Sequence, residues 1–173
     1  MEEPEEDGTT FEANAQLKAR AYAAATGKLC LAEDSGLWVD ALDGDPGVHS
    51  ARYAGEEGSR AERDARNNEK LLREIAAIPI SERTARFVCT MCLATPDGAI
   101  LAESKGTFEG MITSEPKGDG GFGYDPLLLL PDENCTSAEL PREEKNRRSH
   151  RGHAAREMAD KLAELVRHGQ LIF

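Results

Sequence analysis

The chain has 173 residues, of which 39% are hydrophobic and 31% charged, and its formal net charge is −11. This length fits one domain with its own core, and no run approaches the roughly 20 apolar residues of a membrane-spanning helix. The negative charge argues against a nucleic acid polymer as the partner, because polymer binding needs a basic surface. It allows a small anionic substrate that is held by a few basic side chains and a divalent cation.

The chain begins with an acidic, proline-containing stretch over residues 1–8, which we read as a flexible lead-in to a single domain at 9–173. This stretch does not have the basic and then apolar pattern of a secretory signal. Cys89 and Cys92 form a C-x-x-C, a spacing that zinc and redox sites also use. They lie in a strand-like run, however, and a strand turns residues three apart to opposite faces. We therefore expect reduced thiols and a cytoplasmic protein.

The first predicted elements are a helix and two short strands. A capping box at 9–12 and apolar residues at helical spacing predict a helix that stops at Gly27. An apolar strand follows at 29–32 and is interrupted by the polar residues 33–36. Residues 37–41 then alternate between apolar and polar, which predicts a second strand.

The remaining elements are bounded by turn and cap residues. They are a helix that begins at a Ser59–Glu62 capping box and ends before Pro79, a hairpin with strands at 84–95 and 99–107, a glycine-rich loop at 117–123, a short strand at 127–130, and a helix from Ser149 to Arg167. Together they predict one α/β domain, with strands paired mostly as hairpins and helices packed around them.

Glu33 and Asp34 are two adjacent carboxylates between apolar runs. In a simple turn they would only expose two charges to water. If they lie within a sheet, they are costly unless they bind something, and magnesium prefers one or two carboxylates plus phosphate oxygens. Asn14 and Lys18 lie four residues apart and so share one helix face. Lys18 is either solvated or directed at a phosphate.

The loop at 118–126 contains four glycines and an aromatic residue, Phe122. Glycines let the backbone approach a ligand closely, and an exposed aromatic ring can stack on a purine. The alternative is a glycine-rich turn with Phe122 packed into the core. Lys145, His150 and Arg151 gather near the start of the last helix, where N–H groups attract anions and carbonyl oxygens. They are either solvated charges or donors to a keto group.

Read together, these segments resemble the inosine triphosphate pyrophosphatase family, which hydrolyses non-standard purine nucleoside triphosphates. The matching stretches keep the family's order and spacing; they are Thr10–Ala15 with Leu17–Ala19, Asp34–Leu37 with Val39–Leu42, Gly44, Pro46–Gly47, Ser50–Gly55, Gly120–Pro126, Thr136 with Ala138–Leu140, Lys145, and Ser149–Gly152. The resemblance implies a two-lobed fold with a mixed sheet, flanking helices and a central cleft. It also implies a homodimer and a magnesium-dependent cut between the α- and β-phosphates.

The resemblance also implies a role for each site residue. Asp34 matches the catalytic acidic position, which holds Mg²⁺ and helps to deprotonate the attacking water, and Glu33 supports it. Glu5 stands where the family has a further metal-binding glutamate. The residues implied to contact the substrate are Asn14, Lys18 and Ser35 on the phosphate side, Phe122, Gly123, Tyr124 and Asp125 in the base-binding loop, and Lys145, His150 and Arg151 at the 6-keto oxygen.

One part of the family pattern is not found in these residues. Family members begin with a strand and a Ser/Thr-Gly-Asn-x-x-Lys motif that cradles the triphosphate, and this sequence starts at Met1 close to the first helix. Either such a segment precedes Met1 in the full protein or this is a degenerate copy. The alternative functions are a Maf-like pyrophosphatase for other modified nucleotides and a nucleotide-binding protein without turnover.

Overall fold

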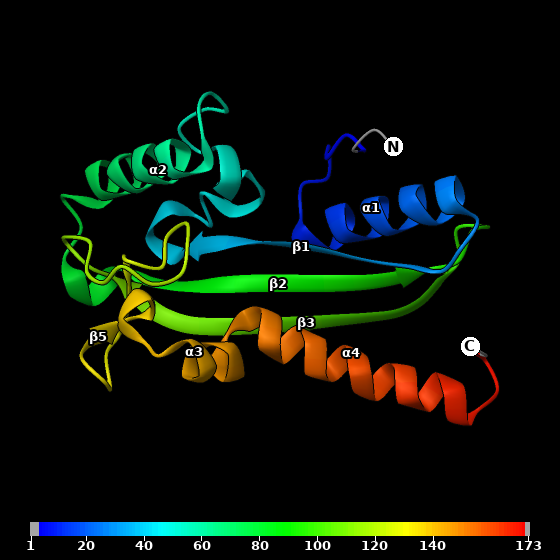
Figure 1. Cartoon of the computed structure of the whole chain (residues 1–173). Coiled ribbons are helices and arrows are strands. Elements are labelled where there is room, and N and C mark those ends of the chain that lie inside the picture. Colours follow the sequence, from blue (N-terminus) through cyan, green and yellow to red (C-terminus); the bar gives the residue numbers. More distant parts are fainter. Residues whose placement is uncertain (1–3, 172–173) are drawn as a thin grey trace. The chain divides into compact units, whose positions relative to one another are not determined.

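The computed structural model describes residues 4–171 and forms a five-stranded sheet with helices around it (Figure 1). The sheet order is β1-β2-β3-β4-β5, so each strand lies next to its neighbour in sequence. The elements in chain order are α1 (Phe11–Thr26), β1 (Cys30–Val39), α2 (Arg60–Ile75), β2 (Thr84–Ala94), β3 (Ile100–Ile112), β4 (Leu128–Leu130), β5 (Cys135–Thr136), α3 (Arg142–Arg148) and α4 (His150–Arg167).

The α/β class is therefore confirmed, but the mixed sheet is a correction. β4 pairs antiparallel with both β3 and β5, and β1, β2 and β3 alternate in direction (Figure 1). Hairpin connections produce this pattern because each strand turns back beside the one before it. No helix in residues 4–171 is long and apolar enough to span a membrane.

The chain forms two compact units, and β1, β2 and β3 each contribute to both. Unit 1 contains the residues up to Ser35, Val88–Thr107 and those from Ser149 onward. Unit 2 contains Gly36–Phe87 and Phe108–Arg148. The two-lobed arrangement around a cleft stays a prediction.

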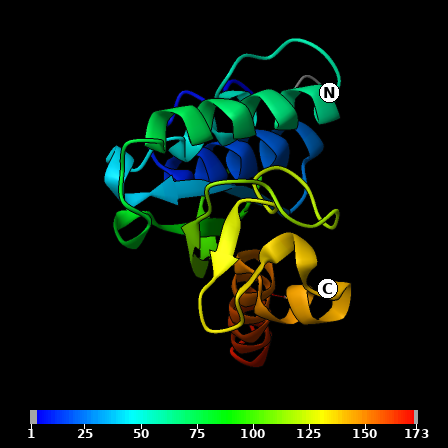
Figure 2. The same cartoon turned by 90° about the vertical axis from the view of Figure 1, so that its left-hand side faces the viewer.

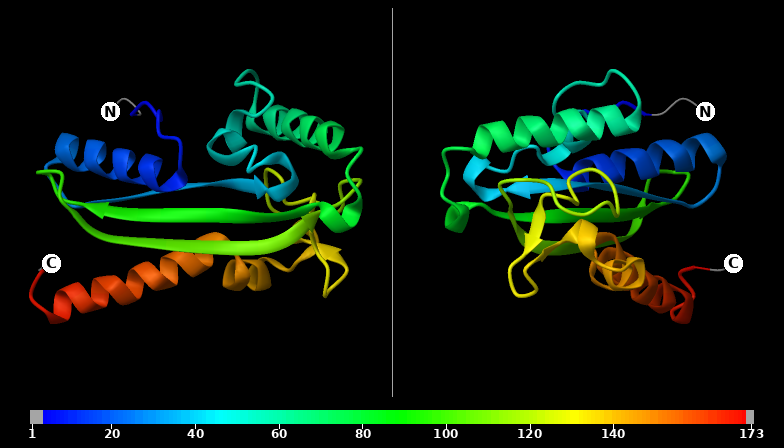
Figure 3. Two further views of the ribbon diagram at one scale, coloured as in Figure 1. Left: turned by 180° about the vertical axis from the view of Figure 1, so that it is seen from behind. Right: turned by 60° about the vertical axis from the view of Figure 1, so that its left-hand side comes forward.

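In unit 1, α1 and α4 cover opposite faces of the sheet segment (Figures 1 and 3). The buried alanines of α1 pack against Cys92 and Ala94 of β2, whereas Leu93 packs with Met158 of α4. Because side chains alternate along a strand, Cys89 shares the face of Leu93 and not that of Cys92. The prediction that the two cysteines point to opposite faces is thus confirmed.

Local signals set the ends of α1. Thr10 is the N-cap and its side chain accepts a hydrogen bond from the N–H of Ala13, and Gly27 ends the helix with a left-handed φ of 65°. The predicted capping box at 9–12 is wrong in its cap residue, because the N-cap is Thr10 and not Thr9; Glu12 pairs with Lys105 at 2.7 Å. The helix begins where predicted because the Thr10 cap alone satisfies a free N–H group.

The predicted break at residues 33–36 is wrong, because β1 runs without interruption from Cys30 to Val39. The polar residues stay in the strand because each charged side chain has a partner. Glu33 pairs with Arg151 and Asp34 pairs with Lys18. A strand tolerates such charges when opposite charges are within hydrogen-bonding distance.

Unit 2 has its own apolar core, and α2 packs on it. Leu71 and Ile75 of α2 are fully buried and join a cluster with Leu37, Phe87 and residues of β3 and β4. The capping box of Ser59 with Glu62 is confirmed and starts α2 at Arg60. The glycine-rich loop is yellow-green in Figure 2. It contacts α2 through hydrogen bonds between side chains of the helix and the backbone of Gly123.

Candidate active site

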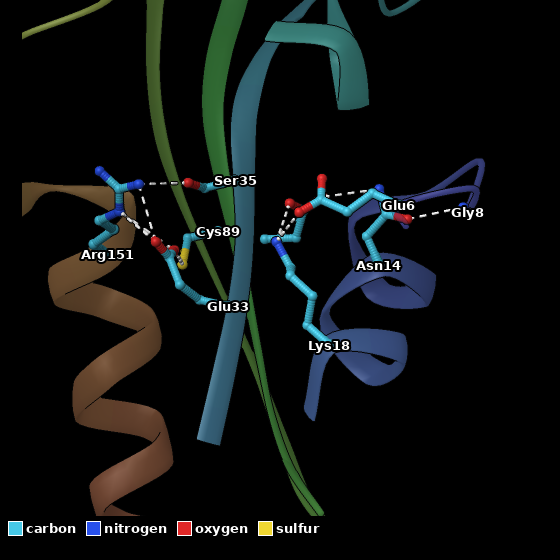
Figure 4. A network of polar contacts seen from close by, with 9 residues as sticks. Glu6, Gly8, Asn14, Lys18, Glu33, Ser35, Cys89 and Arg151 are labelled. Atoms are coloured by element: carbon cyan, nitrogen blue, oxygen red, sulfur yellow. Dashed lines mark hydrogen bonds and ion pairs between the residues drawn. The ribbon is translucent and has the colours of Figure 1, made fainter. Parts of the chain in front are cut away.

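Asp34 lies on β1, and its carboxylate is bonded to polar side chains of α1. Figure 4 labels two of these side chains, Asn14 and Lys18. Its carboxylate accepts hydrogen bonds from Lys18 Nζ at 2.7 Å and from Asn14 Nδ2 at 3.3 Å. Lys18 Nζ also pairs with Glu6 at 2.9 Å. Asp34 is only 8% exposed, so this group is a nearly buried carboxylate that shares one lysine with a second carboxylate.

The electrostatics of this group leave it short of positive charge. Burial, together with the nearby Glu6, raises the pKa of Asp34 above its ordinary value despite the Lys18 hydrogen bond. Burial lowers the pKa of Lys18, but hydrogen bonds to Asp34 and Glu6 outweigh it and the net pKa lies above its ordinary value. Two carboxylates with one ammonium group are an arrangement that a divalent cation would stabilise.

Glu33 and Ser35 lie on the other side of β1, next to the start of α4 (Figure 4). Arg151 donates from Nε to Glu33 at 3.1 Å and from Nη2 to the Ser35 hydroxyl at 2.9 Å. The thiol of Cys89 donates to Glu33 at 3.1 Å. Burial raises the pKa of Glu33, but hydrogen bonds from Arg151 and Cys89 outweigh it and bring the pKa below its ordinary value. Glu33 is therefore a firmly ionised anchor for Arg151.

The N-terminus of α4 brings His150 and Arg151 to this place. Ser149 caps the helix by accepting a hydrogen bond from the N–H of Gly152 at 3.0 Å. His150 is 8% exposed. On β3, Gly106 permits the approach of the helix, because a Cβ there would lie 2.1 Å from the carbonyl oxygen of His150. Only glycine leaves room for so close a contact.

In unit 2, the glycine-rich loop presents Phe122 with 46% of its surface exposed. The alternative that Phe122 packs into the core is thus wrong. The guanidinium carbon of Arg60 lies 4.7 Å from the centre of the ring, and Lys145 Nζ lies 5.3 Å from it. An exposed aromatic ring with two cations next to it can stack on a flat, electron-rich ligand.

Asp125 organises this loop from inside the protein. It is 3% exposed, and it accepts hydrogen bonds from the N–H of Phe122 and the hydroxyl of Ser137, both at 2.8 Å. Lys145 forms an ion pair with the same carboxylate. Tyr124 is buried in the unit 2 core and donates to the carbonyl of Ser50 at 2.8 Å. These side chains hold the loop and leave Phe122 at the surface.

The residue pattern and the fold match those of known proteins. A model of the Ham1 family matches residues 1–161. The chain belongs to the Ham1 family. It is 55% identical over 161 residues to the dITP/XTP pyrophosphatase of Nitratidesulfovibrio vulgaris, a match that covers 91% of this chain and 77% of the relative. It is 52% identical over 158 residues to the enzyme of the same name from Halalkalibacterium halodurans, with 91% and 79% covered.

Solved structures of Ham1 proteins have the same fold as this chain. The Ham1 protein of Staphylococcus aureus superposes with a TM-score of 0.85 at 43% identity, over 93% of this chain and 80% of that one. A nucleoside-triphosphatase described as a dITP/XTP pyrophosphatase, from Mycobacterium abscessus, gives a TM-score of 0.78 at 44% identity, over 91% and 78%. The family resemblance stated from the motifs is therefore confirmed.

The structure of this Ham1 chain assembles the predicted residues into groups within each unit. Unit 1 contains one group on each side of β1, and unit 2 contains the loop group with Lys145. Gly123 holds the loop through its backbone hydrogen bonds, and Tyr124 holds it by packing into the core. Glu5 is exposed, whereas its neighbour Glu6 pairs with Lys18. The metal role of Glu5 stays a prediction.

Sequence reasoning missed several members of these groups. They are Glu6 beside Lys18, Cys89 behind Glu33, Ser137 at Asp125, and Arg60, Asp64 and Asn68 of α2 at the loop. The four-residue spacing of the α2 residues was a visible signal of a shared helix face. Nothing in the sequence indicated which loop that face would contact.

Proposed function

We propose that this Ham1 chain hydrolyses non-standard purine nucleoside triphosphates, such as ITP, dITP and XTP, to the monophosphate and pyrophosphate. Relatives named dITP/XTP pyrophosphatases that share 52–55% of its residues support this activity. The observation that carries the proposal is the buried Asp34 carboxylate, held by Lys18 and Asn14 and next to a second acidic residue. Such a group can position water and cation at a phosphoanhydride.

Mg²⁺ fits the residues around Asp34. In residues 4–171 no group of three or more acidic, histidine or cysteine side chains could hold a metal by itself. Magnesium commonly takes only one or two carboxylates and completes its shell with water and substrate phosphates. Asp34 with Glu6, or with Glu5, would hold the ion, which when bound neutralises the polyphosphate and polarises the reacting phosphorus. Asp34 orients the attacking water, and Lys18 binds phosphate oxygens.

The purine base is recognised by hydrogen-bond donors and by an aromatic ring. Phe122 stacks on the purine, and Lys145, His150 and Arg151 donate hydrogen bonds toward the 6-keto oxygen. An adenine amino group would place a donor against these donors and leave buried polar groups unpaired, which lowers its affinity. Ser35 and Glu33 fix the direction of Arg151 through the hydrogen bonds described above.

We further propose that the protein is a cytoplasmic homodimer, as the family resemblance implies. Light scattering of the purified protein tests the dimer, and a mass equal to one chain would contradict it.

The test of activity compares triphosphates with one purified sample. We expect pyrophosphate release from ITP, dITP and XTP at rates at least tenfold above ATP, and loss of release when EDTA removes the metal. Faster hydrolysis of modified pyrimidine triphosphates would favour the Maf-like alternative instead. Thermal stabilisation by ITP without any pyrophosphate release would favour a binding protein without turnover.

A further inference from the structure

Helix α2 carries Arg60, Asp64 and Asn68 at four-residue intervals, and all three contact the loop that presents Phe122. Residues at this spacing share one face of a helix. We propose that this row, which we name the α2 clamp, is a positioning device that presets Phe122 for stacking and thereby determines the affinity for the nucleotide base. The inference rests on the proposed role of Phe122.

The clamp holds both backbone groups of a single loop residue. Asp64 Oδ2 accepts a hydrogen bond from the N–H of Gly123 at 2.9 Å, and Asn68 Nδ2 donates to the carbonyl of Gly123 at 3.1 Å. Gly123 has a φ of 60°, in the left-handed region that favours glycine. A glycine is free to leave this conformation, so the two side chains supply the constraint that the residue itself does not.

Arg60 constrains the ring. Its guanidinium carbon lies 4.7 Å from the centre of the Phe122 ring, a cation–π distance. The ring is 46% exposed, and exposed side chains otherwise exchange among rotamers. Asp64 and Asn68 therefore fix the backbone on one side of Phe122, and Arg60 restricts the side chain itself.

Preorganisation of this kind acts on binding and not on the chemical step. A ring that is already held in place loses less conformational freedom when a base stacks on it. The benefit is the same for each purine, because stacking uses the ring face and not its substituents. The clamp residues belong to unit 2 and Asp34 belongs to unit 1, so the chemical step at the phosphate should not be affected.

The experiment uses substitutions at Asp64 in the complete chain. Asp64→Ala removes the acceptor for the Gly123 N–H, whereas Asp64→Asn keeps an acceptor oxygen and should rescue most of the effect. Arg73→Ala, an exposed residue further along α2, is the matched control. Calorimetry measures the dissociation constants of IMP, XMP and inorganic pyrophosphate, and steady-state assays with ITP separate KM from kcat.

Loss of this charge-assisted hydrogen bond should weaken IMP and XMP binding by the same factor, about tenfold. KM for ITP should rise equally while kcat stays within about twofold, and pyrophosphate, which has no base, should bind as in the parent. Arg73→Ala should change nothing. Unchanged IMP binding in Asp64→Ala, or an equal loss for pyrophosphate, would overturn the proposal.

A double-mutant cycle with Phe122→Ala separates this inference from the proposed function. If the clamp acts through the ring, Asp64→Ala should have little further effect once Phe122 is absent. Additive losses would refute the clamp and leave base stacking intact. If Phe122→Ala alone does not weaken IMP binding, the proposed role of Phe122 fails, and the clamp fails with it.

Discussion

Three successive residues of β1 supply two separate groups of side chains. Glu33 and Ser35 face Arg151 of α4 (Figure 4), and Asp34 is bonded to Lys18 of α1. The two adjacent carboxylates therefore have different surroundings. Glu33 has a full set of donors and a lowered pKa, whereas Asp34 shares its lysine with Glu6 and has a raised pKa. This contrast fits an anchoring role for Glu33 and a metal-binding role for Asp34.

The contrast predicts opposite effects on stability for two isosteric substitutions. The pKa of Asp34 is raised, so the folded protein favours the protonated carboxyl group. This contribution to stability is full below the ordinary pKa of 3.8 and is lost as the pH rises through the raised pKa. At pH 7 Asp34→Asn should therefore raise the melting temperature of the metal-free protein by a few degrees, which corresponds to about 1 kcal/mol, and abolish pyrophosphate release. A fall in melting temperature, or retained turnover, would contradict this.

Glu33→Gln should act in the other direction. Because the pKa of Glu33 is lowered, its stabilising contribution is present above its ordinary value of 4.5 and is lost as the pH falls through the lowered pKa. We expect a loss below about 1 kcal/mol at pH 7, since the side chain is partly exposed. Melting curves of Glu33→Gln and the parent should converge as the pH falls below 4.5. A constant difference at every pH would argue that the charge has no part in it.

A substitution at His150 tests how the protein distinguishes one purine base from another. On the proposed function, His150→Ala should reduce the ratio of kcat/KM for ITP over ATP by about tenfold, the worth of one lost hydrogen bond to a keto group. The ratio matters more than either value, because a general defect would lower both. An unchanged ratio would mean that the base is read by other residues.

At the scale of elements, the contact of α4 with β3 is tightly constrained. Gly106 lets the carbonyl of His150 approach, and Ser149 caps the helix at that end. The last helix was predicted from Ser149 to Arg167, and its bounds are confirmed. On its buried face lie Ala154 and Met158, whereas Ala155 and Val166 are exposed.

This contact predicts a large effect from one methyl group. Gly106→Ala would place a Cβ against helix backbone, which cannot move as a flexible side chain can, so we expect a loss of about 1–3 kcal/mol. Gly98→Ala in the β2–β3 turn, where a Cβ meets no atom within 4 Å, separates this clash from backbone strain at a positive φ of 86°. Urea unfolding of both variants measures the difference. An unchanged unfolding midpoint for Gly106→Ala would show that the close approach does not require glycine at this position.

At the scale of the whole molecule, three long strands run from one unit into the other. β1, β2 and β3 each supply core residues to both units, so neither unit can lose its part of a strand independently. We therefore expect one cooperative unfolding transition.

Two core substitutions test this cooperativity. Leu71→Ala in unit 2 and Met158→Ala in unit 1 should each lower the same calorimetric transition, by about 2–5 kcal/mol in free energy of unfolding. Both residues are buried, at 0% and 2% exposure. Two separate transitions, each moved by only one of the substitutions, would show that the units unfold independently.

Local patterns in the sequence determined α1, α2 and α4, the β2–β3 hairpin and the family, whereas α3 was not predicted. Cap residues and apolar spacing act over a few residues, which is why Ser59, Gly27 and Ser149 could be read directly. The ordered motifs around Asp34, Phe122 and His150 were enough to indicate the Ham1 family and its chemistry.

Only the tertiary structure decided how β1 accommodates Glu33 and Asp34. Their stability in a strand depends on Arg151 and Lys18, and Arg151 is separated from Glu33 by more than a hundred residues. The polar row of α2 gives a second example. Its four-residue spacing could be seen in the sequence, but its contact with Gly123 could not. A charge or a polar row can be recognised locally, but the free energy that keeps it in place comes from a partner that folding brings to it.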